Sequence, residues 1–542
     1  AHALCASFNR TDFIETPVLR PELRTNGQPR DRIREQRDAM NGFEDVALLL
    51  LIAVPLLGSI AMMFMPGGDS EETWYFAIFI AAISFALSLV IFADYDYDLG
   101  GFQLLSSYEW LPGPLDINLT LGIDGISAPM VLLNGIVLLG GVLVSQTVKH
   151  RTRDFFVLLF ALSAGVYGVF VARDLFFLFF FYELAVLPMY LLIGVWGSST
   201  DFGTFLRTKE YGAMKLLIYL VAGSILVWIG ILALYVEASD QGFATFSLDG
   251  LAQLARDGEF DSNFQTWVFP LFMVGFGVLA GLWPFHTWSP DGHVAAPTAV
   301  SMLHAGVLMK LGAYGIIRVG MFLLPEGADN WMPVLITLGT VNVLYGAISA
   351  MSQNDLKYII GYSSVSHMGY VLMGIATLDN VGVAGAVLQM FSHGIMTALM
   401  FLLVGAIYER THTRDINVLN GLASRMPANT FFFAIAGLAS LGLPGLSGFI
   451  AEFLVFTGAF RTYLPLAILA VIGAALTAIY ILRLLARTFM GEADERWADL
   501  PDASPVEMSV GGAFVGILIF VGVWPDPLLR VINVGVSTIP GV

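Results

Sequence analysis

The stretch LFFLFFFYELAVLPMYLLIGVW, residues 175–196, is apolar apart from one ionisable side chain, Glu183. A helix of about 20 such residues crosses a hydrocarbon core roughly 30 Å thick. Similar runs recur along the chain, and they predict an all-α polytopic membrane protein with about fourteen transmembrane helices. The runs begin near Val46, Trp74, Ile126, Phe155, Leu175, Tyr211, Trp267, Ala295, Met332, Tyr358, Val381, Thr430, Tyr463 and Val506.

The composition agrees with a membrane protein. Of 542 residues, 57% are hydrophobic and only 13% are charged, and the mean hydropathy is +0.75. The net charge of −17 argues against nucleic-acid binding, which needs basic surfaces. Lysine and arginine cluster in the loops that follow odd-numbered spans, so the positive-inside rule places those loops on the inner side. Residues 94–121 read as an exposed loop or hairpin, and residues 246–256 as a short amphipathic surface helix.

The first 39 residues differ from the rest of the chain. They are polar and lack the apolar core of a signal peptide. Seven arginines on the outer side conflict with the positive-inside rule, which favours a start of translation at Met40. The single cysteine, Cys5, lies in this segment, so no disulfide framework, cysteine-ligated metal or iron–sulfur cluster is expected.

Three ionisable residues each stand alone in an apolar run. They are Glu183, Lys310 within 294–317 and Glu452 within 442–460. A charge at the bilayer centre costs about 2.5 kcal/mol or more, so such residues usually face a polar interior and have a function. A buried lysine whose pairing with a carboxylate changes is suited to take up and release protons. A static role remains the alternative for each of the three.

Helix-breaking residues interrupt two of the runs. The sequence WPFHTWSPDGH, residues 283–293, ends the seventh run, and LGLPGLSG, residues 441–448, interrupts the twelfth before Glu452. Broken helices at corresponding places in two halves are typical of inverted-repeat transporters. Zinc binding by His286 and His293 is conceivable, but no HExxH pattern occurs, and we expect no metal.

These features predict a division of the chain into five parts. The parts are a polar extension (1–39), helices 1–3 with an external loop (40–153), a first inverted repeat of helices 4–8 (154–322), a second inverted repeat of helices 9–13 (331–490), and an amphipathic connection with helix 14 (491–542).

Five segments together resemble the antiporter-like membrane subunits of respiratory complex I. They include FYELAVLPMYLLIGVWG (181–197) and DLKYIIGYSSVSHMGYVLMG (355–374), and the others are residues 284–318, 392–416 and 425–460. The last segment, with LASLGLPGLSGFIAEFLVF, is similar to the subunit M branch, the counterpart of mitochondrial subunit 4. The resemblance covers roughly residues 44–530.

The resemblance implies roles for individual residues. Glu183 matches a glutamate that pairs with a seventh-span lysine, Lys310 matches the central proton carrier, and Glu452 matches a residue near the outer exit. His367 and His393 match polar positions of the connecting path. The position of the seventh-span lysine holds Leu279 instead. Lys215, at the start of the sixth span, is the nearest basic candidate to pair with Glu183 apart from residues at the loop edges, and this places it in the proton path. In the static alternative, Lys215 or Arg173 clamps Glu183. His304 is expected to pack on another face of its helix, away from Lys310.

Three functions are compatible with these observations. The first is a proton-translocating subunit of NADH:quinone oxidoreductase, the second a subunit of a multisubunit cation/proton antiporter, and the third a spacer that no longer pumps. In the first case NADH, FMN, iron–sulfur clusters and quinone belong to partner subunits, because the chain offers no strand–helix context for a nucleotide-binding fingerprint. The expected surroundings are the cell membrane, its lipid and neighbouring antiporter-like subunits, without nucleic acid.

Overall fold

The computed structural model describes residues 29–65, 71–111, 113, 115, 117–201 and 206–542. Residues 1–28, which include Cys5, lie outside the described residues. They make up most of the segment before Met40, the predicted start of translation. The contacts divide the chain into two compact units, residues 1–44 and residues 45–542, and the second unit holds the membrane-spanning bundle.

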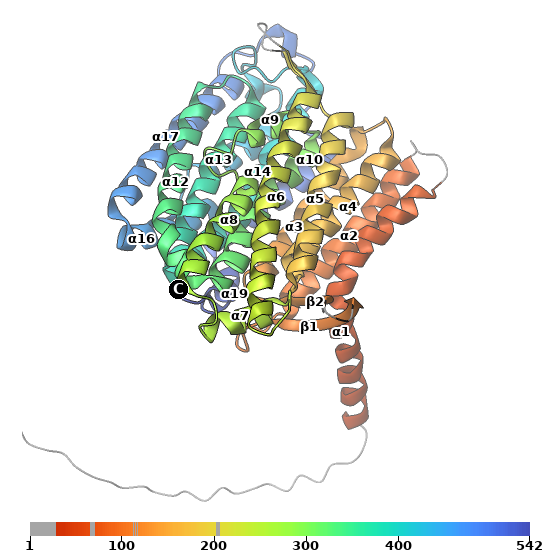
Figure 1. The fold of residues 1–542 in the computed structure, drawn as a ribbon. Helices are drawn as coiled ribbons and strands as arrows, with labels where there is room; N and C mark the ends of the chain where they lie inside the picture. The colour runs from red at the N-terminus through yellow and green to blue at the C-terminus, as the bar shows by residue number, and fades with distance from the viewer. Residues whose placement is uncertain (1–28, 66–70, 112, 114, 116, 202–205) are drawn as a thin grey trace, which may run out of the picture. The chain divides into compact units, whose positions relative to one another are not determined.

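The structure is a bundle of long apolar helices (Figure 1). Thirteen helices of the described residues are long and apolar enough to cross a membrane. They are α1 (Pro29–Met63), α2 (Glu71–Asp94), α3 (Ser127–Val144), α4 (Thr152–Val171), α5 (Leu175–Trp196), α6 (Lys209–Asp240), α8 (Ser262–Ala280), the compound helix Thr298–Met321, α12 (Pro325–Ser352), α13 (Leu356–Ala376), α14 (Asn380–Thr411), α17 (Leu464–Phe489) and α18 (Pro505–Val523). A broken span made of α15 (Pro427–Ser440) and α16 (Ser447–Thr462) completes the fourteen predicted runs.

Shorter elements join the spans. They are the helices α7 (Leu248–Arg256), α9 (Trp288–Ala295) and α19 (Asp526–Val536), the 3-10 turns η1 (Ser145–Thr147), η4 (Leu422–Ser424) and η5 (Glu495–Trp497), and the strands β1 (Gln103–Leu111), β2 (Ile117–Ile123), β3 (Thr200–Asp201) and β4 (Leu206–Arg207). The predicted hairpin is β1 and β2, which pair antiparallel, and the predicted surface helix is α7. The sequence did not separate α19 from helix 14, although Leu528, Val531 and Ile532 of α19 are buried.

The compound eighth span departs from regular α-helix. It consists of α10 (Thr298–Leu303), the π-helical turn η2 (His304–Leu308), α11 (Met309–Gly315) and a second π-helical turn, η3 (Ile316–Met321). Such turns are frequent at functional sites. Every residue from 299 to 321 is buried inside the protein, so this span has no face toward lipid.

The two predicted helix breaks are confirmed. In the seventh span, α8 ends at Gly281, which has a left-handed φ of 79°, and the chain resumes as α9. The side chain of Asn342 on α12 hydrogen-bonds the backbone at this break. Its Oδ1 accepts from Trp283 N at 2.6 Å, and its Nδ2 donates to Gly281 O at 2.7 Å. Backbone groups freed within a membrane need such partners. In the twelfth span, Gly442 and Gly445 take left-handed φ values of 72° and 93° between α15 and α16.

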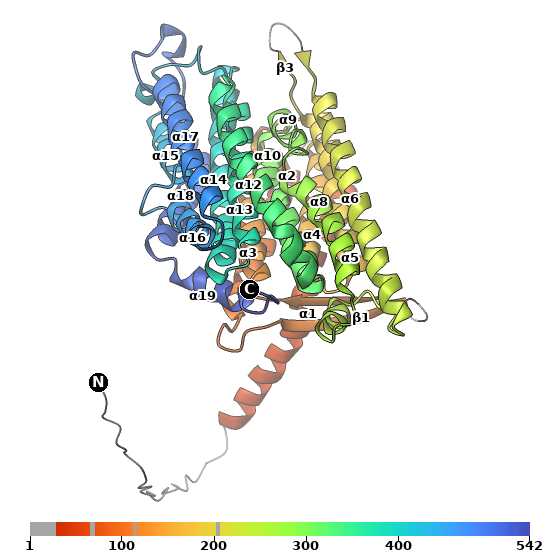
Figure 2. The same cartoon turned by 60° about the vertical axis from the view of Figure 1, so that its left-hand side comes forward.

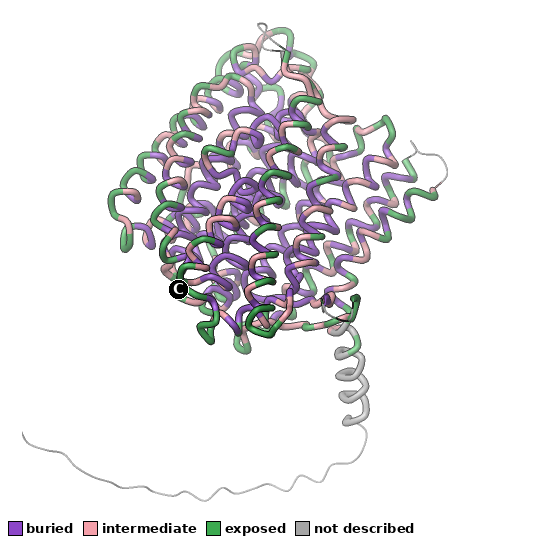
Figure 3. Tube along the Cα trace, in the orientation of Figure 1, coloured by how far each residue is buried: buried purple, intermediate pink, exposed green. Residues whose placement is uncertain are grey.

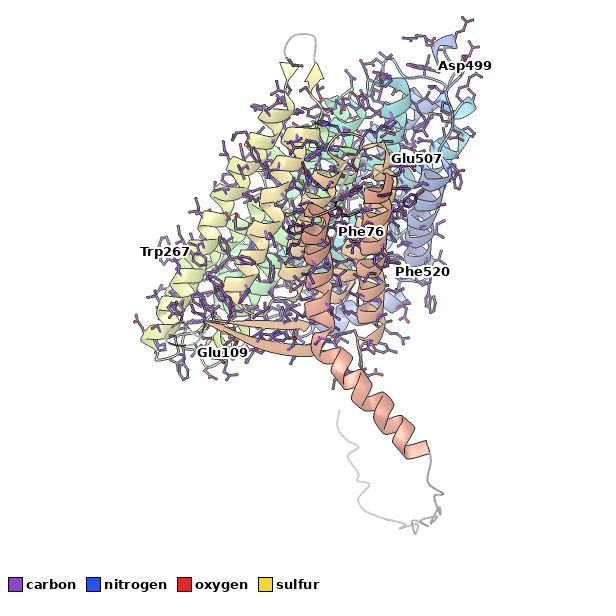
Figure 4. All side chains as sticks on the ribbon, turned by 90° about the vertical axis from the view of Figure 1, so that its right-hand side faces the viewer. Phe76, Glu109, Trp267, Asp499, Glu507 and Phe520 are labelled. Carbon is purple, nitrogen blue, oxygen red and sulfur yellow. The ribbon has the colours of Figure 1, made fainter. Side chains whose placement is uncertain are left out.

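Buried and exposed residues are distributed as a membrane bundle requires. Figure 3 shows the inner helices buried and the exposed residues on the outer helices and at the ends. In Figure 2, α5, α6 and α8 lie on one side of the bundle, and α15 to α18 lie on the other. Figure 4 places the acidic residues Glu109 and Asp499 at opposite ends, with Phe76 and Phe520 between them. This order matches charged surfaces outside an apolar belt.

Close helix packing depends on small residues, and Gly165 of α4 gives a prediction. A Cβ at Gly165 would lie 2.6 Å from Ala185 N of α5, whereas a Cβ at Gly512 of α18 would meet nothing within 4 Å. Gly165→Ala therefore forces α4 and α5 apart, and we expect a loss of about 1–3 kcal/mol in stability. The midpoint of thermal unfolding of the purified protein measures this loss. The matched Gly512→Ala variant should melt like wild type, and equal midpoints for all three proteins would contradict the packing described.

Candidate functional site

Lys310 lies at the centre of the bundle, on α11 directly after the first π-helical turn. Its side chain is fully buried. Its Nζ lies 2.7 Å from His393 Nδ1 and donates to the carbonyl of Ala305 within the π-helical turn. No acidic side chain pairs with Lys310 among the described residues, so its polar contacts are neutral groups of its own span and of α14.

The histidines continue from Lys310 across two helices. The rings of His393 on α14 and His367 on α13 have centroids 5.4 Å apart. The Nδ1 of His367 lies 3.3 Å from Glu452 Oε1, and its Nε2 lies 2.9 Å from Ser440 Oγ. His393 Nε2 has no hydrogen-bond partner among the described residues. Both ring nitrogens of His367 have partners, so His393 Nε2 is the ring nitrogen of this pair left for a water.

Glu452 ends this row at the break of the twelfth span. It lies on α16, is 5% exposed, and its Oε2 is 2.9 Å from where a Cβ on Gly442 would stand. The glycine leaves room for the carboxylate beside the unwound turn. Four of the predicted residues, Lys310, His393, His367 and Glu452, thus form one continuous row, which we call the central row.

Glu183 and Lys215 do not join each other. Lys215 Nζ binds Asp291 Oδ2 at 2.8 Å instead. Arg173, the other partner considered for Glu183, binds Asp249. Glu183 is half-buried on α5, its Oε1 lacks a hydrogen-bond partner, and no salt bridge to it is present in the part of the chain that the structure describes. Lys215, the candidate partner from the sixth span, is therefore paired with Asp291 and not with Glu183.

Asp291 is the site residue that the sequence interpretation missed. It lies on α9 in the broken seventh span, is 4% exposed, and binds Arg207 Nη1 at 2.5 Å in addition to Lys215. Tyr358 of α13 donates to the same carboxylate at 3.0 Å. Two cations and a hydroxyl offset the cost of burying this carboxylate. Its place in the SPDGH sequence beside a helix break was the available signal.

His293 and His304 form a second buried contact near the central row. Their ring centroids are 4.0 Å apart, and His304 also stacks on Trp288 at 5.3 Å. Neither ring has a hydrogen-bond partner among the described residues. The ring contacts of His304 agree with the packing role expected for it. The described residues contain no group of three histidine, cysteine, aspartate or glutamate side chains able to hold a metal ion.

The transmembrane family described as NADH:quinone oxidoreductase/Mrp antiporter matches residues 172–477. The chain belongs to this family. The match covers the whole central row, Asp291 and both breaks, so the resemblance inferred from the motifs is confirmed.

Relatives of this antiporter-like family cover nearly the whole chain. An NAD(P)H-quinone oxidoreductase chain 4 of Picosynechococcus sp. is 36% identical over 530 residues, which are 91% of this chain and 93% of the relative. The chain 4 of Acaryochloris marina is 37% identical, over 89% and 90% of the two chains. These names agree with the predicted similarity to subunit 4.

Solved structures of the family have the same fold. A chain of respiratory complex I from Thermus thermophilus superposes with a TM-score of 0.80 at 27% identity, over 90% of this chain and 99% of that chain. A chain of the Mrp complex from Dietzia sp. also reaches 0.80, over 92% and 97% of the two chains, but at 20% identity, so it supports the fold alone. The predicted antiporter-like membrane fold is confirmed.

Proposed function

We propose that this chain is a proton-translocating membrane subunit of an NADH:quinone oxidoreductase of the complex I type. The observation that carries the proposal is the central row, a buried amine joined through two histidines to a buried carboxylate. A membrane protein has to offset the cost of these groups, and a proton path is a common reason to keep them. The relatives at 36–37% identity carry the corresponding name.

In this proposal the chain itself performs no redox chemistry. NADH, FMN, iron–sulfur clusters and quinone bind to partner subunits, and the chain lies among antiporter-like neighbours in the cell membrane. Electron transfer in the partners would change the charge near Lys310, and the amine would then pass its proton to His393. His367 and Glu452 continue the path toward the surface at which α16 ends. The two inverted repeats, residues 154–322 and 331–490, would each contribute one broken helix.

The alternatives differ in their partners and in their use of the central row. A cation/proton antiporter subunit would share the fold but lack redox partners, and its structural relative is only 20% identical. A spacer would keep the helices without using Lys310. The chain should be tagged, purified from native membranes, and its partners identified by mass spectrometry. Flavin- and iron–sulfur-binding chains support the proposal, whereas antiporter chains alone contradict it.

Leu279 gives a test of whether Glu183 faces the seventh span. Leu279 is fully buried on α8. Tyr182, the residue before Glu183, contacts Phe276, which lies about one helical turn before Leu279, and the two ring centroids are 6.0 Å apart. Leu279→Lys should therefore assemble, because Glu183 can neutralise the new amine. Leu279→Lys combined with Glu183→Gln should not, because an unpaired buried charge costs about 2.5 kcal/mol or more.

The amount of assembled complex on native gels measures both variants. Leu279→Met combined with Glu183→Gln is the matched control, since it introduces no charge, and it should assemble normally. Equal assembly of the single and double lysine variants would show that Glu183 does not reach the position of Leu279.

A further inference from the structure

A cavity of about 200 Å³ lies where the β1–β2 hairpin, α7 and the end of the eighth span meet. Figure 1 shows α7, β1 and β2 together at one end of the bundle. The cavity lies apart from the central row. Its lining includes Phe102, Arg173, Asp249, Ala252, Arg256 and Arg318.

Arg173 is fixed rigidly at this cavity. Its backbone N–H donates to Thr120 O of β2 at 2.8 Å, and its carbonyl accepts from Leu248 N of α7 at 3.0 Å. The side chain is 4% exposed, and its guanidinium binds Asp249 through Nε and Nη2. The remaining nitrogen, Nη1, has no hydrogen-bond partner among the described residues.

Arg318 has the same incomplete pairing. It lies in the last turn of the eighth span and is 2% exposed. Its Nη2 lies 2.5 Å from Asp124 Oδ2, and its Nε donates to Tyr314 Oη at 3.3 Å. Its Nη1 also lacks a partner in the described part of the chain. A buried guanidinium nitrogen left without an acceptor is costly, so each arginine has an unused donor.

One aromatic ring holds the two guanidiniums close to each other. The centroid of the Phe102 ring is 3.3 Å from Arg173 Cζ and 4.7 Å from Arg318 Cζ. Stacking on an aromatic face orients a guanidinium without using its hydrogen-bond donors. Two guanidinium groups therefore lie next to one cavity, and each has one nitrogen, Nη1, without a hydrogen-bond partner among the described residues.

The charges around the cavity do not balance. Arg173, Arg256 and Arg318 give three positive charges against two negative charges on Asp124 and Asp249, so the net charge is +1. Burial lowers the pKa of Arg173, and the neighbouring Asp249 opposes this shift. A single negative charge inside the cavity would neutralise the cluster. Arg256 is exposed at the rim, where its Nη2 donates to Gln253 Oε1 at 2.8 Å.

We propose that this cavity binds a phosphate group carrying one negative charge. The planar donor pairs of arginine match phosphate oxygens, and a phosphate would supply acceptors for the unused donors. Two sources share this chemistry: the phosphodiester of a phospholipid headgroup and inorganic phosphate. The cavity lies at the end of the eighth span, Thr298–Met321, and the ends of membrane spans meet the headgroup region of a bilayer.

The whole complex, purified in detergent and washed free of loosely bound lipid, serves for the test. Elemental analysis gives phosphorus per complex, and electron cryomicroscopy gives the density in the cavity, each with and without added inorganic phosphate. Arg173→Gln removes a donor, and Ala252→Phe fills the cavity while leaving every arginine in place. Arg530→Gln, an exposed charge change on α19, is the matched control.

We expect one phosphorus fewer per complex in both cavity variants and no change in Arg530→Gln. Density that continues into acyl chains identifies a lipid, and compact density that needs added phosphate identifies the free ion. If Arg173→Gln fails to assemble, the Ala252→Phe result decides. Water alone in the cavity, a carboxylate of a neighbouring subunit in it, or unchanged phosphorus in Ala252→Phe would overturn the proposal.

Discussion

Membrane vesicles that carry Lys310→Met are expected to lose almost all NADH-driven membrane potential. Methionine keeps the length and apolar contacts of the side chain but cannot hold a proton. Loss of a group that transfers protons typically slows a reaction by about 10²-fold or more. Lys310 Nζ lies 2.7 Å from His393 Nδ1, so the substitution leaves the first histidine of the central row without the amine that contacts it.

A potential-sensitive dye measures the effect, and the subunit content of the vesicles shows whether the complex assembles. Lys149→Met is the matched control, because Lys149 is exposed in the loop before α4 and lies outside the central row. It should generate a potential like that of wild type. A normal potential in Lys310→Met would favour the spacer over the proton-translocating subunit.

Glu452→Gln should produce the second largest loss. Glutamine has nearly the same shape and can still accept a hydrogen bond at the position of Glu452 Oε1, 3.3 Å from His367 Nδ1, so the fold should be preserved. It cannot take up a proton near neutral pH, and the last step of the row would be blocked. We expect proton translocation to fall by about 10²-fold.

The control for this variant is Glu492→Gln, at an exposed position between α17 and η5. Proton uptake by reconstituted complex, followed with a pH-sensitive dye, compares the two. If Glu452→Gln translocates protons like Glu492→Gln, the carboxylate is a structural partner of His367 and the path leaves the row before it.

The sequence allowed the spans and most of the central row to be predicted. Glu452 and Lys310 stood out because a lone charge in an apolar run is costly. The breaks were predictable from Pro444 and the glycines around it, and from Pro284 and Pro290 at the end of the seventh span. The hydrogen bond from Asn342 to Gly281 O was not predictable, because it joins residues 61 positions apart in the sequence.

The ion pairs could not be assigned from the sequence. Lys215 was considered for Glu183 because it is near in sequence, but it binds Asp291, 76 residues further along. A lysine has a long flexible side chain, so distances in three dimensions decide its partner. The π-helical turns of the eighth span also escaped prediction, because no residue type marks them as proline marks a kink.

The central claim is that protons cross the membrane through Lys310 and the row that follows it. Its most direct test is the number of protons taken up per electron transferred, measured on purified Lys310→Met complex in liposomes with NADH and quinone. We expect the variant complex to have normal subunit content. Any NADH:quinone turnover that remains should take up fewer protons per electron than wild type, or turnover should be absent. The wild-type ratio at the wild-type turnover would contradict the claim.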